Sequence, residues 1–227
     1  MNARWPALIA CSLILTGCAG MQNPQQANLD HCRNQLKASK AENYPLVLQE
    51  GDLCLQETKL SAPLQSLIYA VQADAYNNLK YFPEAVAAKE KSMQLVKPNP
   101  RDNLDLSYMY RGAGNPKKAL ELVQYNLDNG LGEAGKGSGF HMPTYYHLGL
   151  ALTDLGQYRE AAEAFSTGLQ RQPDFAWAYY ARGIAYDHLA DKDGAKADFL
   201  KFAQLANKKY VLEEQKAKLT EYSISLP

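Results

Sequence analysis

The chain has 227 residues, with 24 Lys or Arg and 24 Asp or Glu side chains, so its formal net charge is zero. This balance gives no electrostatic reason to bind nucleic acid or an acidic membrane surface. Hydrophobic residues make up 46% of the chain. That apolar content is enough for one elongated domain, or a small array, to bury a core.

Residues 1–17 have the pattern of an export signal. Arg4 supplies a positive charge, and the apolar run from Ala7 to Leu15 is too short to span a bilayer as a permanent helix. The tetrapeptide Leu15-Thr16-Gly17-Cys18 resembles the lipobox of bacterial lipoproteins. This resemblance implies that Cys18 carries acyl chains such as palmitate and is the first mature residue. The alternative is an ordinary signal peptide cleaved near Ala19.

Residues 18–28 follow as a tether. They are small and rich in amides, and Pro24 interrupts them, a composition that supports no packed core. In the lipoprotein family the residue after the cysteine influences sorting, and Ala19 lacks the aspartate associated with retention in the inner membrane. The resemblance therefore implies a bacterial cell-envelope protein, anchored in the outer membrane and facing the periplasm.

The sequence predicts a degenerate helical hairpin over residues 29–65, which contains Cys32 and Cys54. An exported protein meets an oxidising compartment, where an even pair of cysteines favours a disulfide. Antiparallel helices over 28–42 and 44–58 bring both cysteines to the same end of the hairpin. Two alternatives remain at this point: a pair of buried free thiols, or a metal site shared with His31.

A 34-residue period dominates the rest of the chain. Gly149, Ala161 and Phe165 recur as Gly183, Ala195 and Phe199. A fixed period of this length indicates a stacked array of supersecondary units. Earlier, Ala85 and Tyr76 are echoed 34 positions later by Ala119 and Tyr110. The period predicts four repeats, at 66–99, 100–133, 142–175 and 176–209, with residues 28–61 as a candidate fifth.

The repeat resembles the tetratricopeptide repeat, in which two antiparallel helices pack closely through small residues at the eighth and twentieth positions. The resemblance implies an all-α, right-handed superhelical solenoid of four to five hairpins, with the array over 66–207. Two departures from the pattern occur in the earlier repeats: Lys89 stands at the twenty-fourth position and Ser107 at the eighth. Bulky side chains at Gly149 or Ala161 are expected to force the helices apart.

The apolar pattern over residues 208–223 predicts a helix that caps the array. Val211, Leu212, Gln215, Leu219 and Tyr222 form a stripe at helical spacing, interleaved with charged residues.

The glycine-rich insertion 134–141 separates the second and third of these repeats. Gly130, Gly135 and Lys136 nearly match a phosphate-binding loop, but Gly137 replaces the Ser or Thr that holds magnesium. A flexible connector is the better interpretation, so no nucleotide is expected.

No residue pattern predicts an active site. The four histidines lack zinc-ligand spacing, and no serine stands in a Gly-x-Ser-x-Gly sequence. We therefore expect no enzyme activity, no cofactor and no metal. An envelope hydrolase assembled from Asp154, Asp187 and His188 is the unfavoured alternative.

The resemblance places the binding surface on the concave face, along the first helix of each repeat. Tyr, Trp and Arg side chains often dominate binding energies, and this face is expected to be rich in them. Its predicted protein-binding residues are Asn77, Asn78, Arg101, Tyr108, Arg111, Tyr146, Asp154, Trp177, Tyr180 and His188. About half of the aromatic residues are expected to fill space between repeats instead.

The layout is similar to that of NlpI-type repeat lipoproteins. It implies a periplasmic scaffold or adaptor that binds envelope proteins or peptides and is held to the membrane by its lipid anchor. The alternative is a secretion or pilus assembly lipoprotein with a structural positioning role. Helical arrays of this size also form homodimers through terminal repeats, and a homodimer is a further possible assembly.

Overall fold

The computed structural model describes residues 29–57, 60–129 and 141–226. In these ranges the chain forms α1 (Asp30–Lys40), α2 (Tyr44–Leu55), α3 (Ala62–Asn78), α4 (Phe82–Leu95), α5 (Pro100–Gly112), α6 (Pro116–Asp128), α7 (His141–Asp154), α8 (Tyr158–Arg171), α9 (Ala176–His188), α10 (Lys192–Leu205), the 3-10 turn η1 (Lys208–Tyr210) and α11 (Glu213–Glu221). The all-α prediction is confirmed. None of the described helices is long and apolar enough to cross a membrane.

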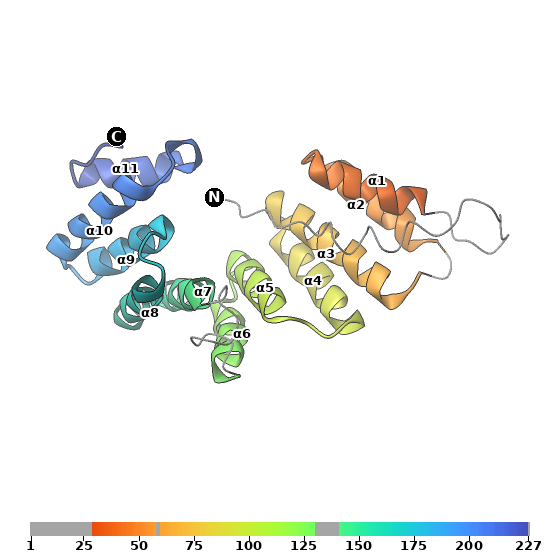
Figure 1. Ribbon diagram of the computed structural model, residues 1–227, viewed down its shortest axis with the longest axis horizontal. Coiled ribbons are helices and arrows are strands. Elements are labelled where there is room, and N and C mark those ends of the chain that lie inside the picture. Colours follow the sequence, from red (N-terminus) through yellow and green to blue (C-terminus); the bar gives the residue numbers. More distant parts are fainter. Residues whose placement is uncertain (1–28, 58–59, 130–140, 227) are drawn as a thin grey trace.

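Successive helices pair into five hairpins that follow one another along an arc. The hairpin of α1 and α2 lies at one end of the arc and α11 at the other (Figure 1). Consecutive first helices α5, α7 and α9 contact one another, whereas the second helices α4, α6, α8 and α10 have at most marginal contact with each other. The first helices therefore line the shorter, inner side of the arc.

The 34-residue period recurs in the turn between the two helices of each hairpin. Lys80, Gly114, Gly156 and Ala190 all have positive φ, as does Glu42 in the first hairpin. The residue after each of them donates its backbone N–H to the carbonyl oxygen five positions earlier, at 2.8 to 3.0 Å. This is a Schellman motif, which satisfies carbonyl groups at a helix end. Lys80 and Gly114 are 34 positions apart, as are Gly156 and Ala190.

The close approach of the two helices depends on glycine where the facing residue is phenylalanine. A Cβ atom added to Gly149 would lie 2.5 Å from Cε1 of Phe165, and one added to Gly183 would lie 2.7 Å from Cε1 of Phe199. Both phenylalanines are fully buried. Ser107 fits at the same position in the hairpin before that of Gly149, where Val123 stands at the position of the phenylalanine.

Cys32 and Cys54 join α1 to α2 by a disulfide with a Cα–Cα distance of 5.0 Å. This is the pairing that the sequence analysis favoured. Both cysteines are buried, and Ile68 of α3 packs against them. His31 does not join them; its Nδ1 contacts Oε2 of Glu50 at 2.7 Å.

Several predicted boundaries differ from the structure. The first helix of repeat 66–99 begins earlier, at Ala62, and the cap helix is shorter than 208–223. Leu212, assigned to the buried stripe of the cap, is 58% exposed because it precedes the first turn of α11. Ile224 is buried against α11 and α10 in its place. Cys18, the tether and insertion residues 134–140 lie outside the described residues.

Candidate protein-binding surface

The predicted binding residues occupy the first helices α3, α5, α7 and α9, which form the inner side of the arc. They divide into two groups by exposure. Five are exposed to solvent: Asn78, Arg101, Tyr108, Asp154 and His188. The other five are partly buried: Asn77, Arg111, Tyr146, Trp177 and Tyr180.

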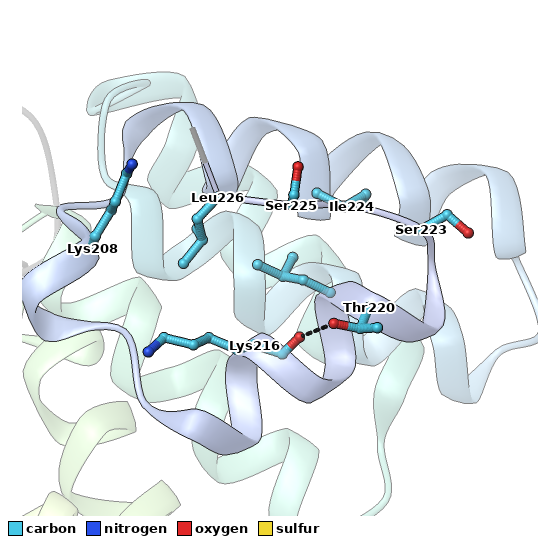
Figure 2. A pocket seen from close by; sticks show the side chains of 8 residues that line it. Lys208, Lys216, Thr220, Ser223, Ile224, Ser225 and Leu226 are labelled. Carbon is cyan, nitrogen blue, oxygen red and sulfur yellow. Dashed lines mark hydrogen bonds between the residues drawn. The ribbon is translucent and has the colours of Figure 1, made fainter.

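A pocket of about 560 Å³ lies on the cap, outside the inner side of the arc, between α11 and the terminal residues that fold back over it (Figure 2). Lys208 and Lys216 line one side of it, and Leu219, Ile224 and Leu226 contribute apolar surface. Leu219 and Ile224 are part of the core that closes the array. This pocket contains none of the predicted binding residues.

A second pocket, of about 430 Å³, opens where α5 meets the ends of neighbouring helices, and it brings three predicted residues together. It is lined by Phe82, Tyr108, Arg111, Gly112, Gly114, Pro116 and Asp154. The Tyr108 side chain is the exposed aromatic group of this pocket, and the residue is 42% accessible.

An ion pair forms one wall of this pocket and links α5 to α7. Nε of Arg111 donates to Oδ2 of Asp154 at 2.5 Å, and Nη2 of Arg111 donates to Oδ1 at 3.1 Å. Such two-point pairing fixes the orientation of both side chains. Arg111 has five N–H donors, and the carboxylate has further lone pairs, so each group retains hydrogen-bonding capacity.

Phe82, which the sequence analysis did not identify, also lines this pocket. Phe82 is the first residue of α4, and Gly112 allows its ring to lie against α5, because an added Cβ at Gly112 would be 2.4 Å from Cδ1 of Phe82. Lys80 lies over the same ring at 5.8 Å. The available signal in the sequence was an aromatic residue two positions after Lys80. Its counterpart in repeat 142–175, Tyr158, likewise contacts an inner-face residue, His188.

Tyr146 and His147 of α7 lie near the pocket residues Tyr108 and Arg111. The Tyr146 ring lies 6.0 Å from the ring of Phe165 and 5.1 Å from that of Phe175. Burial raises the pKa of Tyr146 to about 12. Burial also lowers the pKa of His147 to about 3, with a smaller contribution from nearby Arg111. His147 is therefore neutral at physiological pH, and it meets the Tyr108 ring edge-on at 6.5 Å.

A charged cluster lies beside the pocket, between α3, α4 and α5. Nζ of Lys89 donates to Oδ1 of Asp102 at 2.8 Å and lies 3.6 Å from Oδ2 of Asp105. Arg101 pairs with Asp105 at 3.1 Å. Lys89 is only 5% exposed and stands at the twenty-fourth position of its repeat, which Phe165 and Phe199 hold in the later hairpins. A buried ion pair therefore replaces a buried aromatic ring at this position.

Asp74 faces this cluster from α3 and, among the described residues, forms no ion pair. Solvent reaches Asp74, but the surrounding protein displaces much of the water that would hydrate its carboxylate. This partial desolvation, with a smaller contribution from Asp105, raises the pKa of Asp74 to about 6, although Lys89 and Arg101 oppose the shift. One turn further along α3, Oδ1 of Asn77 is buried without a hydrogen-bond partner.

The predicted residues on α9 mainly hold the C-terminal end together. The rings of Trp177 and Tyr180 lie 5.3 and 5.0 Å from Phe202. His188 stacks on Tyr158 at 4.1 Å. Asp187 accepts hydrogen bonds from Lys192, Lys218 and Tyr222, of which the last two belong to the cap region.

The alternative catalytic residues have separate partners. Asp154 pairs with Arg111, Asp187 is bound by groups of the cap region, and His188 stacks on a tyrosine. Within the described ranges, no group of three or more His, Cys, Asp or Glu side chains could hold a metal ion.

Over the residues that the structure describes, five stacked hairpins with a recurring turn define an all-helical repeat fold. The TPR repeat family matches residues 149–187, and the tetratricopeptide repeat family matches residues 178–209. The chain therefore contains tetratricopeptide repeats, as the sequence analysis predicted.

Solved structures show the same fold over most of the chain. The crystal structure of MamA protein has 17% sequence identity and a TM-score of 0.60, covering 87% of this chain and 96% of that chain. YrrB, described as a TPR protein with an unusual peptide-binding site, has 16% identity and a TM-score of 0.58 over 84% of this chain and 90% of that chain. MamA from Desulfovibrio magneticus RS-1 has 16% identity and a TM-score of 0.63, covering 77% of this chain and 92% of that chain. No curated protein matches the sequence.

Proposed function

We propose that this protein is a scaffold that binds partner proteins through extended peptide segments, in the pocket around Tyr108. The observation that carries the proposal is an exposed aromatic side chain in a pocket on the inner side of the array, next to the Arg111–Asp154 ion pair. Tyr and Arg are enriched among residues that dominate binding energies. YrrB, with a similar fold, is described as having a peptide-binding site.

The pocket suits a peptide because it combines apolar and polar groups. Phe82 and Tyr108 offer apolar surface to a partner side chain, and Arg111 and Asp154 offer a donor and an acceptor to the peptide backbone. Such a scaffold acts by holding proteins together, without catalysis.

We further propose that the scaffold is a lipoprotein at the outer membrane, attached through Cys18 and facing the periplasm. Two features support this location. The segment Leu15-Thr16-Gly17-Cys18 resembles a lipobox. The Cys32–Cys54 disulfide is also suited to an oxidising compartment. Its partners would then be envelope proteins.

The binding proposal is tested with Tyr108→Ala, compared with Tyr125→Ala as a matched control. Tyr125 is 59% exposed and belongs to α6, a second helix outside the pocket. Partners crosslinked to the full chain in intact cells are identified by mass spectrometry and then measured with purified proteins. Tyr108→Ala should weaken binding about tenfold or more, while Tyr125→Ala should leave it unchanged. Equal binding by all three proteins would contradict the proposal.

The location is tested separately with Cys18→Ser. Cells fed labelled palmitate should label the natural chain and not the variant, and only the natural chain should fractionate with outer membranes. Labelling of the variant, or membrane association that survives the substitution, would refute the lipid anchor without affecting the binding proposal.

A further inference from the structure

The charges beside the Tyr108 pocket do not balance. Asp74, Asp102 and Asp105 provide three carboxylates, while Lys89 and Arg101 provide two cations, which leaves one negative charge. Asp102 and Asp105 both have ion-pair partners within 3.6 Å. The unbalanced charge therefore belongs to Asp74.

Asp74 is positioned to meet a ligand that also reaches Tyr108. The two residues are 34 positions apart and hold the same place in consecutive repeats, on the inner helices α3 and α5. Asp105, which raises the pKa of Asp74, is also on α5, one turn before Tyr108. The α3 and α5 helices have at most marginal contact with each other, because α5 packs on α4 and α7. Both Asp74 and Tyr108 are exposed to solvent, so a ligand can reach each of them.

A carboxylate in this setting is most favourable when a cation joins it. Partial desolvation destabilises the charged form of Asp74, and a cation brought by a ligand would restore the lost stabilisation. The buried carbonyl oxygen of Asn77, one turn away on the same helix, lacks a donor. Lysine and arginine side chains supply both a positive charge and N–H donors.

We propose that the scaffold recognises an extended peptide segment with two anchors: a basic side chain at Asp74 and a large apolar or aromatic side chain in the Tyr108 pocket. This inference rests on the proposed peptide-binding function and specifies the chemistry of the partner.

The repeat geometry gives the spacing of the two anchors. Packed helices lie about 8–10 Å apart, and an extended chain advances about 3.3 Å per residue. Because α3 and α5 are not packed directly on each other, this distance is a lower limit for their separation. A peptide crossing from α3 to α5 therefore places its basic and apolar side chains at least three residues apart, and four is the expected spacing. A partner helix, which rises only about 1.5 Å per residue, would need about six residues for the same distance.

The inference is tested by selection from a display library of random peptides about ten residues long, which span about 33 Å when extended. The immobilised full chain is compared with Asp74→Asn, Tyr108→Ala and the control Asp193→Asn. Asp193 is an exposed aspartate near the start of α10, and among the described residues it forms no ion pair. The natural chain and the control should enrich peptides with Lys or Arg three or four residues from Phe, Tyr or Leu.

Selected peptides are then synthesised and their affinities measured by fluorescence polarisation. Asp74→Asn should bind the basic peptides about tenfold more weakly and should no longer select basic residues. The same peptides with Glu in place of the basic residue should bind the natural chain at least tenfold more weakly, because like charges repel.

The possible failures are distinguishable. If selected peptides depend on Tyr108 but show no basic preference, or bind equally well to Asp74→Asn, the inference is wrong and the proposed function stands. If no peptide that depends on Tyr108 is enriched, both the inference and the proposed pocket are wrong.

Discussion

Replacing Asp74 by asparagine should stabilise the folded protein at about pH 7.5, even though it should weaken peptide binding. Asp74 is deprotonated at this pH and, in the absence of a ligand, forms no ion pair in the described part of the chain. Asparagine is nearly isosteric and carries no charge. The substitution therefore removes an unfavourable charge without creating a cavity.

The magnitude follows from the pKa shift. The pKa of Asp74 rises from 3.8 to about 6, which is about two pK units, or about 3 kcal/mol at 1.36 kcal/mol per unit. Because Asp74 is more than one-third exposed, solvent screening reduces this to about 1 kcal/mol. The pKa is raised on folding, so the favourable contribution of the protonated form is complete below pH 3.8 and is lost as the pH rises through about 6.

Thermal and urea unfolding of the natural chain, Asp74→Asn and Asp193→Asn across this pH range provide the assay. Asp74→Asn should raise the Tm by about 2–4 °C at about pH 7.5, and its advantage should shrink steadily in acid. Asp193→Asn should show no gain in stability at neutral pH, because Asp193 lies in the first turn of α10, where the helix dipole favours a negative charge. If Asp74→Asn lowers the stability at neutral pH, or if its effect is independent of pH, the electrostatic account of this surface is refuted.

Three further predictions concern the packing, the turns and the disulfide. Gly149→Ala should cost about 1–3 kcal/mol of unfolding free energy in urea titrations, because the added Cβ meets the ring of Phe165; an unchanged midpoint would show that the ring can move. Ala190→Gly should increase the free energy of unfolding by up to about 1 kcal/mol and so raise the Tm slightly, since glycine adopts positive φ without steric cost. A lower Tm would contradict this. Reducing the Cys32–Cys54 disulfide, whose cysteines are 22 residues apart, should lower the free energy of unfolding by about 3 kcal/mol and increase hydrogen exchange in α1 and α2. Equal exchange with and without reductant would contradict this stabilising role.

The sequence predicted the fold well because the repeat leaves a visible period. Gly149 and Phe165 recur 34 residues later as Gly183 and Phe199, and in the structure both pairs make the same close contact. The cap was harder to place. Leu212 fits the apolar stripe by spacing alone, but the helix starts one residue later, so its side chain remains exposed.

The binding surface was only partly predictable. Repeat positions identified Tyr108, Arg111 and Asp154 on the inner helices, and the structure brings them to one pocket. The same positions selected Tyr146 and Tyr180, whose rings pack against buried phenylalanines. A repeat register specifies the face of a helix but not how far a side chain leans over the second helix of its own hairpin, where both phenylalanines lie. Exposure depends on such tertiary contacts, which a single sequence does not display.

The buried Lys89 has a consequence for the mechanics of the array. In a solenoid, the stability of the whole depends on the coupling between adjacent repeats. The junction of α4 with α5 is held partly by ion pairs from Lys89 to Asp102 and Asp105, whereas the twenty-fourth position of each of the last two repeats holds a buried phenylalanine. Because Lys89 is buried, salt screens its ion pairs only weakly, but loss of its partners would leave an uncompensated buried charge. The junction of the second and third hairpins thus depends on charge pairing, and a ligand spanning α3 and α5 would add a second connection across it.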